Sequence, residues 1–287
     1  MKIRPITPDD AENCGRVIFE AFRGIDERHN FAYDFPSPEA ARQMAAMCIE
    51  SPDIYGFVAE DENGAFLGSN FLWEHDAICG VGPITIDPAA QSKGVGRRLM
   101  EAVIERGQKA PGIRLVQAAY NTVSMPLYAS LGFEVVEPLV VIEGTPTGGE
   151  TYPALEVRPL EERDLDECAD LCRLIHGFDR ANELKQTSQM FPSVVAVRDG
   201  RIAAYASAPV LWQLNHAVAE SVEDMKALLA GAARITGKPL SLLLPTRQAE
   251  LFRWCLKNGL KVQKPLTLMA MGEYQEPRGA FLPSVLY

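Results

Sequence analysis

The chain has 287 residues, enough for two domains of ordinary size, and its 47% hydrophobic and 23% charged residues are typical of a globular protein. The formal net charge is −10, which argues against nucleic acid or an anionic membrane as a partner. Six scattered cysteines complete no zinc ligand set, so we expect buried thiols and no metal. The first residues lack a signal peptide and no apolar run could span a bilayer, which favours a cytoplasmic protein.

The first fifty residues predict one strand and two helices. A strand over Lys2–Ile6 precedes a helix over Thr7–Phe22, which begins with a threonine cap and carries an apolar stripe. The segment Arg23–Ser37 has no clear periodicity, so we expect it to form a loop. A second helix is predicted over Glu39–Ile49.

A hairpin and an interrupted strand follow. Asn63-Gly64 predicts a tight turn between strands at Ile54–Glu60 and Ala65–Trp73. The next strand, Ile78–Ile86, contains Gly82-Pro83. Glycine and proline inside a strand predict a bulge or a splay in place of regular pairing.

The segment Gln91–Arg98 predicts an anion-binding turn at the start of a helix. Gly94 and Gly96 allow backbone N–H groups to face an anion at the positive end of the helix, and three cations lie in the same segment. A dinucleotide fingerprint needs a third glycine where Leu99 stands, and the Gly-Lys-Ser/Thr of a Walker loop is absent, so neither motif applies. An ordinary strand–helix turn is the alternative.

A second pattern follows one strand later, as Asn121…Leu127-Tyr128…Gly132-Phe133. With Gln91-x-x-Gly-x-Gly it resembles the two signatures of the GNAT N-acetyltransferases, although Ser124 stands at the place of the usual alanine. The resemblance covers about residues 1–144, and the predicted order β-α-α-β-β-β-α-β-α-β is that of the family's fold. It implies an α+β (α/β) architecture in which a mixed, mostly antiparallel central sheet is flanked by helices.

The resemblance also implies acetyl-CoA as the co-substrate. Tyr128 would be the general acid that protonates the departing thiolate, and Asn121 would bind the pantetheine arm. A packing role for Tyr128 and a helix-cap role for Asn121 are the alternatives. The residues implied in cofactor binding are Ile84, Thr85, Ile86, Gln91, Ser92, Lys93, Gly94, Val95, Gly96, Arg97, Arg98 and Asn121.

The acceptor site and the general base are less defined in the sequence. The strand before the anion-binding turn carries no carboxylate, and Glu74 lies just ahead of it on a hairpin tip that is otherwise a solvated turn. The loop after the first helix has aromatic, His and Asp residues that suit a cationic or zwitterionic acceptor, or it is only a capped loop. The carboxylate of Tyr287 is a further candidate, because some tandem relatives place the chain terminus in the active site. The acceptor candidates are Arg28, His29, Asn30, Asp34 and Glu74.

A related pattern begins again after the linker 145–153. Residues 158–168 repeat the Arg-Pro…Asp…Cys spacing of residues 4–14, and a Gly…Pro-Leu pattern near residue 132 recurs near residue 259. We expect a first domain over 1–144, a shortened, degenerate GNAT-like domain over 154–272, and a tail over 273–287 that packs on the body.

The second domain lacks the anion-binding turn. No Gly-x-Gly precedes its helix near residues 221–235, and Glu220, Glu223 and Asp224 would repel a pyrophosphate. We therefore expect one acetyl-CoA site in a chain with two similar folds.

The predicted function is transfer of an acetyl group from acetyl-CoA to a primary amine of a small molecule or peptide, by direct attack in a ternary complex. The alternative is a non-enzymatic acetyl-CoA sensor. The tandem domains could act as a pseudo-dimer in a monomer, or the chain could form a homodimer.

Overall fold

The computed structural model describes residues 1–91, 93–148 and 151–286, and it divides into two compact units. The first comprises Met1–Leu115 and Tyr120–Phe133, and the second comprises Val116–Ala119 and Glu134–Tyr287. The strand at Glu134–Gly144, which we expected to close the first domain, thus belongs to the second unit.

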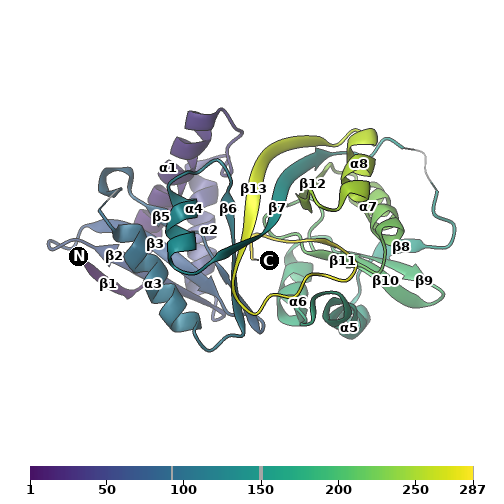
Figure 1. Cartoon of the computed structure of the whole chain (residues 1–287), viewed down its shortest axis with the longest axis horizontal. Coiled ribbons are helices and arrows are strands. Elements are labelled where there is room, and N and C mark those ends of the chain that lie inside the picture. Colours follow the sequence, from purple (N-terminus) through teal and green to yellow (C-terminus); the bar gives the residue numbers. More distant parts are fainter. Residues whose placement is uncertain (92, 149–150, 287) are drawn as a thin grey trace. The chain divides into compact units, whose positions relative to one another are not determined.

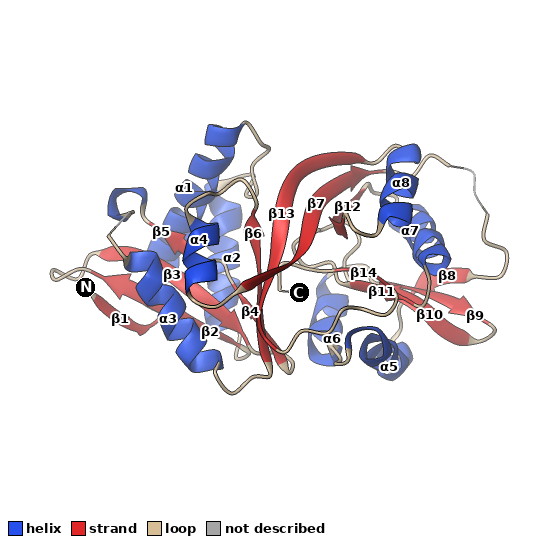
Figure 2. Cartoon of the chain, in the orientation of Figure 1, coloured by secondary structure: helices blue, strands red, loops and turns tan. Residues whose placement is uncertain are grey.

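The elements of the first unit follow the predicted order (Figures 1 and 2). They are β1 (Lys2–Pro5), α1 (Ala11–His29), α2 (Pro38–Glu50), β2 (Ile54–Glu60), β3 (Phe66–Trp73), β4 (Ile78–Val81), β5 (Thr85–Ile86), α3 (Val95–Gly107), β6 (Gly112–Ala118) and α4 (Ser124–Ser130), with short 3-10 turns at Pro8–Asp10 and Pro88–Ala90. The last residues of β6, from Val116 on, are assigned to the second unit.

The sheet of the first unit is mostly antiparallel, as predicted. Its order is β1-β2-β3-β4-β6, in which only the β4–β6 pair is parallel, and β5 pairs with β3. Helices α1 and α2 pack against each other behind the sheet, while α3 lies in front of it (Figure 1). The alternating buried side chains of β2, such as Val58, supply the core between these layers.

The first helix is longer than predicted. The segment Arg23–Ser37 was expected to be a loop, but α1 continues to His29 and ends where Asn30 adopts the left-handed conformation, with φ of 56°. Arg23 pairs with Glu27 one turn later, which supports a helix whose exposed face has no apolar periodicity. Only residues 30–37 form the loop.

The second unit repeats this order of elements between β8 and β13 and adds a strand at each end. Its elements are β7 (Glu134–Gly144), β8 (Glu156–Pro159), α5 (Leu165–His176), α6 (Ala181–Met190), β9 (Val194–Arg198), β10 (Arg201–Ala206), β11 (Ala217–Ala219), α7 (Val222–Thr236), β12 (Leu240–Pro245), α8 (Ala249–Lys257), β13 (Lys261–Gly272) and β14 (Ala280–Leu282), with a 3-10 turn at Glu162–Asp164.

From β8 to β13 these elements correspond one by one to β1 through β7 of the earlier part, apart from β5 and the short turn after it. An ion pair marks the correspondence. The guanidinium of Arg4 binds both oxygens of Asp10 at 2.7 Å, and Arg158 binds Asp164 in the same way at 2.6 and 2.8 Å. Two tandem GNAT-like folds, as predicted, account for this repetition.

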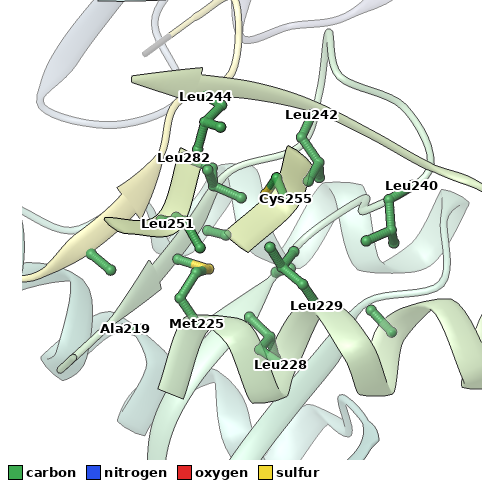
Figure 3. Packing of buried hydrophobic residues seen from close by; sticks show 14 of the residues in the cluster. Ala219, Met225, Leu228, Leu229, Leu240, Leu242, Leu244, Leu251, Cys255 and Leu282 are labelled. Carbon is green, nitrogen blue, oxygen red and sulfur yellow. The ribbon is translucent and has the colours of Figure 1, made fainter. Parts of the chain in front are cut away.

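The five-stranded sheet of the second unit has the order β14-β11-β10-β9-β8. Alternate residues of β9 and β10 face two separate hydrophobic clusters, one against α7 and the other against α5 and α6. Strand β7 pairs with β12 and β13. Figure 3 shows the cluster against α7, in which Leu282 of the C-terminal strand lies with Leu244 and Leu251.

The tail forms a strand of this sheet. β14 pairs antiparallel with β11 through Ala280, Phe281 and Leu282. On its other edge, the amide of Gln248 donates to the Phe281 carbonyl at 2.5 Å and accepts from the Phe281 N–H at 3.2 Å. The side chain of Gln248 thus supplies the pair of hydrogen bonds that a neighbouring strand would make.

Candidate active site

The strand before the anion-binding turn departs from its neighbour. β4 pairs with β6 only over Ile78–Gly80, and the Gly82-Pro83 peptide that follows Val81 is cis. From there the chain continues as β5, which pairs with β3 on one side and with no further strand in the described part of the chain. The splay predicted from Gly82-Pro83 is therefore present. Gly82 itself is bonded, since its N–H donates to the Phe71 carbonyl and its carbonyl accepts from the Trp73 ring N–H. The backbone edge that a ligand can pair with is therefore at residues 83–86.

The helix that follows the anion-binding turn, α3, begins without a side-chain cap. Gly94 is the N-cap of α3, with φ of +79°, and it offers no side chain to satisfy the first N–H groups of the helix. Val95 is buried against Leu99 and Ala90, which fixes the helix against the sheet. The first turn holds no acidic residue. An anion is the natural partner for such a helix start.

The cations of the turn are exposed, as an anion site requires. Lys93, Arg97 and Arg98 all reach solvent, and Lys93 donates to the Ala89 carbonyl at 3.2 Å. Gln91 is also exposed, in an extended conformation after the short turn Pro88–Ala90. Ser92, the remaining predicted residue of the turn, lies outside the described residues.

Helix α4 lies against the start of α3. The Arg97 guanidinium donates to the Ser130 hydroxyl at 2.7 Å, and that hydroxyl donates to the Leu127 carbonyl. A Cβ on Gly96 would lie 3.4 Å from a Leu127 methyl group, which is an ordinary contact. The two predicted signatures are thus adjacent in space, although about thirty residues separate them in the sequence.

Asn121 caps the segment that leads into α4. Its side-chain oxygen accepts from the backbone N–H groups of Val123 at 3.1 Å and Ser124 at 3.2 Å. The cap role that we considered for Asn121 is therefore present. The amide N–H groups of its side chain have no partner among the described residues and could still donate to a ligand.

Tyr128 is buried in α4. It is 6% exposed, and its ring meets Phe133 edge-on at 6.4 Å between centroids. Burial raises the pKa of Tyr128 well above its ordinary value, and a hydrogen bond with Ser124 opposes the shift. The phenol is therefore protonated at physiological pH and can act as a donor.

The acceptor candidates at the end of α1 lie together. Arg28, His29 and Asn30 are exposed at the C-terminal end of the helix, and Asp34 follows in the loop. The backbone N–H of Asp34 donates to Asp26 at 3.0 Å, so the loop is tied to the helix.

Two residues beside this loop escaped the sequence analysis. Asp26 is fully buried, and Tyr120 donates its hydroxyl to Asp26 at 3.3 Å while its ring packs on His29 and Phe31. A signal for Asp26 was available, because it lies four residues after Phe22 on the apolar stripe of α1. No local pattern distinguishes Tyr120.

Glu74, the remaining acceptor candidate, lies elsewhere. Its carboxylate forms a two-point ion pair with Arg106 at 2.8 and 3.0 Å, and Arg106 also covers the Tyr55 ring. Arg106 is in the last turn of α3, whereas the anion-binding turn is at the first, about 18 Å away by helix geometry. The structure does not bring Glu74 together with the other candidates.

The corresponding helix of the second unit begins differently. The Ser221 hydroxyl caps α7 by accepting from the Asp224 N–H, and the acidic side chain of Asp224 pairs with Arg198. Cys255, which is buried in α8, takes the position that Tyr128 has in α4. The start of α7 therefore has a side-chain cap and two acidic residues in its first turn, whereas the start of α3 has neither. The Tyr287 carboxylate lies outside the described residues.

Among the described residues, no group of three or more His, Cys, Asp or Glu side chains is arranged to hold a metal ion. Within the same residues, no helix has the length and apolar character needed to cross a bilayer. All six cysteines are buried free thiols.

Comparison with known proteins agrees with this geometry. Residues 20–133 match the model of the acetyltransferase (GNAT) family. No curated protein matches the sequence. A solved structure from Pyrococcus horikoshii, assigned as an acetyltransferase, is similar over 97% of this chain and 93% of its own, with 16% identity and a TM-score of 0.74.

Two further structures share the fold over most of the chain. A GCN5-related N-acetyltransferase from Sphaerobacter thermophilus is similar over 97% of this chain and 98% of its own, with 15% identity and a TM-score of 0.62. A GCN5-related glucosamine N-acetyltransferase region of a fungal β-N-acetylglucosaminidase covers 94% of this chain and 38% of its own, with 13% identity and a TM-score of 0.65. Residues 20–133 therefore match the acetyltransferase (GNAT) family, and the chain shares the fold of these solved acetyltransferase structures.

Proposed function

We propose that the first unit binds acetyl-CoA and transfers its acetyl group to a primary amine of a small molecule or peptide, in a ternary complex. The observation that carries this proposal is the adjacency of an uncapped, cation-rich helix start and a buried phenol, joined by the Arg97–Ser130 hydrogen bond. The first feature suits a pyrophosphate, and the second suits a departing thiolate.

The cofactor would extend from the anion-binding turn to the splayed strand. Backbone N–H groups of residues 94–97 and the side chains of Lys93, Arg97 and Arg98 would hold the pyrophosphate. The open backbone edge at residues 83–86 would bond the pantetheine arm as an added strand, and one of its N–H groups would polarise the thioester carbonyl. The side-chain amide of Asn121 would donate to the same arm.

The chemical step is attack of a neutral amine on the thioester carbonyl. The nitrogen lone pair forms the new C–N bond, and the C–S bond breaks with its electron pair on sulfur. Tyr128 would donate a proton to that thiolate, and the proton that nitrogen loses would restore the phenol through solvent. An alkyl amine has a pKa near 10, so deprotonation before attack makes the rate rise with pH. Because burial raises the pKa of Tyr128, the donor form persists across that range.

The acceptor would bind at the loop 30–37 and the end of α1. His29 and Asp34, with the rings of Phe31 and Tyr120, combine negative charge with aromatic faces, which suits a cationic amine. We leave Glu74 out of this site because its carboxylate is paired with Arg106. The second unit would not bind acetyl-CoA and would have a non-catalytic role.

The proposal is tested by thiol release from acetyl-CoA with a panel of polyamines, amino acids, aminoglycosides, amino sugars and lysine peptides. We expect at least one amine to release thiol. Tyr128→Phe should lower kcat about 10²–10⁴-fold while acetyl-CoA still raises the melting temperature. Equal activity of Tyr128→Phe would remove the phenol from the mechanism.

The alternative, a non-enzymatic acetyl-CoA sensor, makes a different prediction for the same experiment. Acetyl-CoA would raise the melting temperature, but no amine of the panel would release thiol. Absence of any thermal shift with acetyl-CoA would exclude both functions.

A further inference from the structure

A fully buried carboxylate connects the loop 30–37, here called the acceptor loop, to the segment that leads into α4, the helix of Tyr128. Asp26 lies on the apolar stripe of α1 with no exposed surface. A buried carboxylate is costly unless hydrogen bonds satisfy its oxygens. One oxygen accepts from the Asp34 N–H at 3.0 Å, and the other accepts from the Tyr120 hydroxyl at 3.3 Å. These donors come from two segments that are distant in the sequence.

Tyr120 contacts the acceptor loop through its ring as well. The ring centroid lies 5.0 Å from that of His29 and 4.5 Å from that of Phe31. Burial, together with the charges of Asp26 and Asp34, raises the pKa of Tyr120 well above its ordinary value. The hydroxyl therefore stays protonated and remains a donor to Asp26. The start of the loop is thus held against the Tyr120 ring, and its middle is held at Asp34 by Asp26.

The same tyrosine leads directly to α4. Tyr120 immediately precedes Asn121, whose side-chain oxygen caps the turn into the helix that carries Tyr128. Helix α4 has a separate attachment to α3 through Ser130 and Arg97. Loss of the Tyr120–Asp26 hydrogen bond should therefore make the acceptor loop more mobile but leave α3 and α4, which would bind the cofactor, largely unchanged.

We propose, on the basis of the proposed acetyltransferase function, that Asp26 and Tyr120 are positioning residues that hold the acceptor loop, residues 30–37, in fixed relation to Tyr128. Neither residue exchanges a proton with the substrates in this mechanism. Their hydrogen bond sets where the amine lies, so they determine amine affinity without contributing to acetyl-CoA affinity.

The test is Tyr120→Phe, which removes the hydroxyl and retains the ring contacts, with Asp26→Asn as a second variant that retains the shape. The matched control is Tyr55→Phe, since Tyr55 is a tyrosine of the same unit that packs under Arg106. With the most active amine of the panel, we expect both site variants to raise the amine KM about tenfold, the size expected for a hydrogen bond to a charged group. The acetyl-CoA KM should change less than twofold, and the control should change neither.

A second measurement needs no acceptor amine, so it separates this inference from the proposed function. Hydrogen–deuterium exchange should become faster over residues 30–37 in Tyr120→Phe, while exchange in α3 and the thermal shift with acetyl-CoA stay unchanged. If the panel yields no substrate, faster loop exchange still supports the link and only the proposed function fails. Unchanged loop exchange, or an acetyl-CoA KM that rises as much as the amine KM, would overturn the inference.

Discussion

The guanidinium of Arg97 donates to the hydroxyl of Ser130 at 2.7 Å, joining the first turn of α3 to the last turn of α4. This hydrogen bond therefore links the helix that begins at the anion-binding turn to the helix that carries Tyr128.

Removal of charge at the anion-binding turn should weaken acetyl-CoA binding. Arg98→Gln removes an exposed cation from the first turn of α3, and we expect the acetyl-CoA Kd to rise about 3- to 10-fold at low salt, with a smaller ratio at high salt because exposed charges are screened. Lys109→Gln makes the same charge change beyond the other end of the helix and serves as the control. Calorimetric titration measures both, and equal Kd values for the two variants would contradict an anion site at this turn.

Alanine substitution of the two glycines of the turn should change the unfolding free energy in opposite directions. Gly94 has φ of +79°, so Gly94→Ala should cost about 1–2 kcal/mol of unfolding free energy from backbone strain alone, because open space surrounds its added Cβ. Gly96 lies inside α3 with a helical backbone, so Gly96→Ala should stabilise by up to about 1 kcal/mol.

Both alanine variants should nevertheless weaken acetyl-CoA binding, because in the proposed complex each methyl group would stand where the backbone approaches the pyrophosphate. Urea denaturation and thermal shift with acetyl-CoA measure the two effects. A Gly96→Ala variant that is more stable and binds acetyl-CoA unchanged would place the pyrophosphate elsewhere.

The repeated ion pairs should make stability depend on acid pH. A hydrogen bond from Arg4 lowers the pKa of Asp10, and one from Arg158 lowers the pKa of Asp164. For a lowered carboxyl pKa, the stabilisation is complete above the unfolded value near 3.9 and is lost as pH falls through the folded value. Asp164→Asn should therefore lower the unfolding free energy by about 1–2 kcal/mol at pH 7, and the difference from wild type should shrink below pH 4.

Asp170→Asn is the control for Asp164→Asn, because Asp170 is an exposed aspartate on the next helix whose contact with Arg173 is a surface pair. Urea denaturation at a series of pH values measures both variants. An Asp164→Asn deficit that stays constant down to pH 2.5 would show that the ion pair is not its source.

The C-terminal strand should be required for the stability of the second unit. Leu282→Ala removes a fully buried side chain from the cluster of Figure 3, and we expect a loss of about 2–5 kcal/mol. Leu174→Ala, at an exposed leucine of the same unit, should cost less than 1 kcal/mol. Urea denaturation distinguishes them. Equal losses would mean that β14 is not part of the folded core.

Local chemistry made much of the first unit predictable. A hairpin turn at Asn63-Gly64, an interruption at Gly82-Pro83 and the glycine turn before α3 each depend on a few adjacent residues, and all three are present. The helix α1 was predicted too short because its last two turns carry mostly polar side chains, among them the exposed Arg23–Glu27 pair and the buried Asp26.

Relationships between distant residues were not predictable in the same way. The hydrogen bond from Tyr120 to Asp26 spans 94 residues, and nothing near Tyr120 in the sequence indicates its partner. The assignment of β7 to the second unit depends on its pairing with β12 and β13, which lie about a hundred residues later. Strand pairing at such separations is decided by the folded sheet and not by local preference.

The place of β14 at the edge of β11 has a consequence for synthesis of the protein. The first unit is complete in the chain once Phe133 has been made, whereas the sheet of the second unit lacks a strand until residues 280–282 have been made. Until then β11 has an open edge, which is the kind of surface that pairs with other chains. A premature stop codon shortly before Ala280 would therefore leave residues 20–133 intact but yield a protein inclined to aggregate.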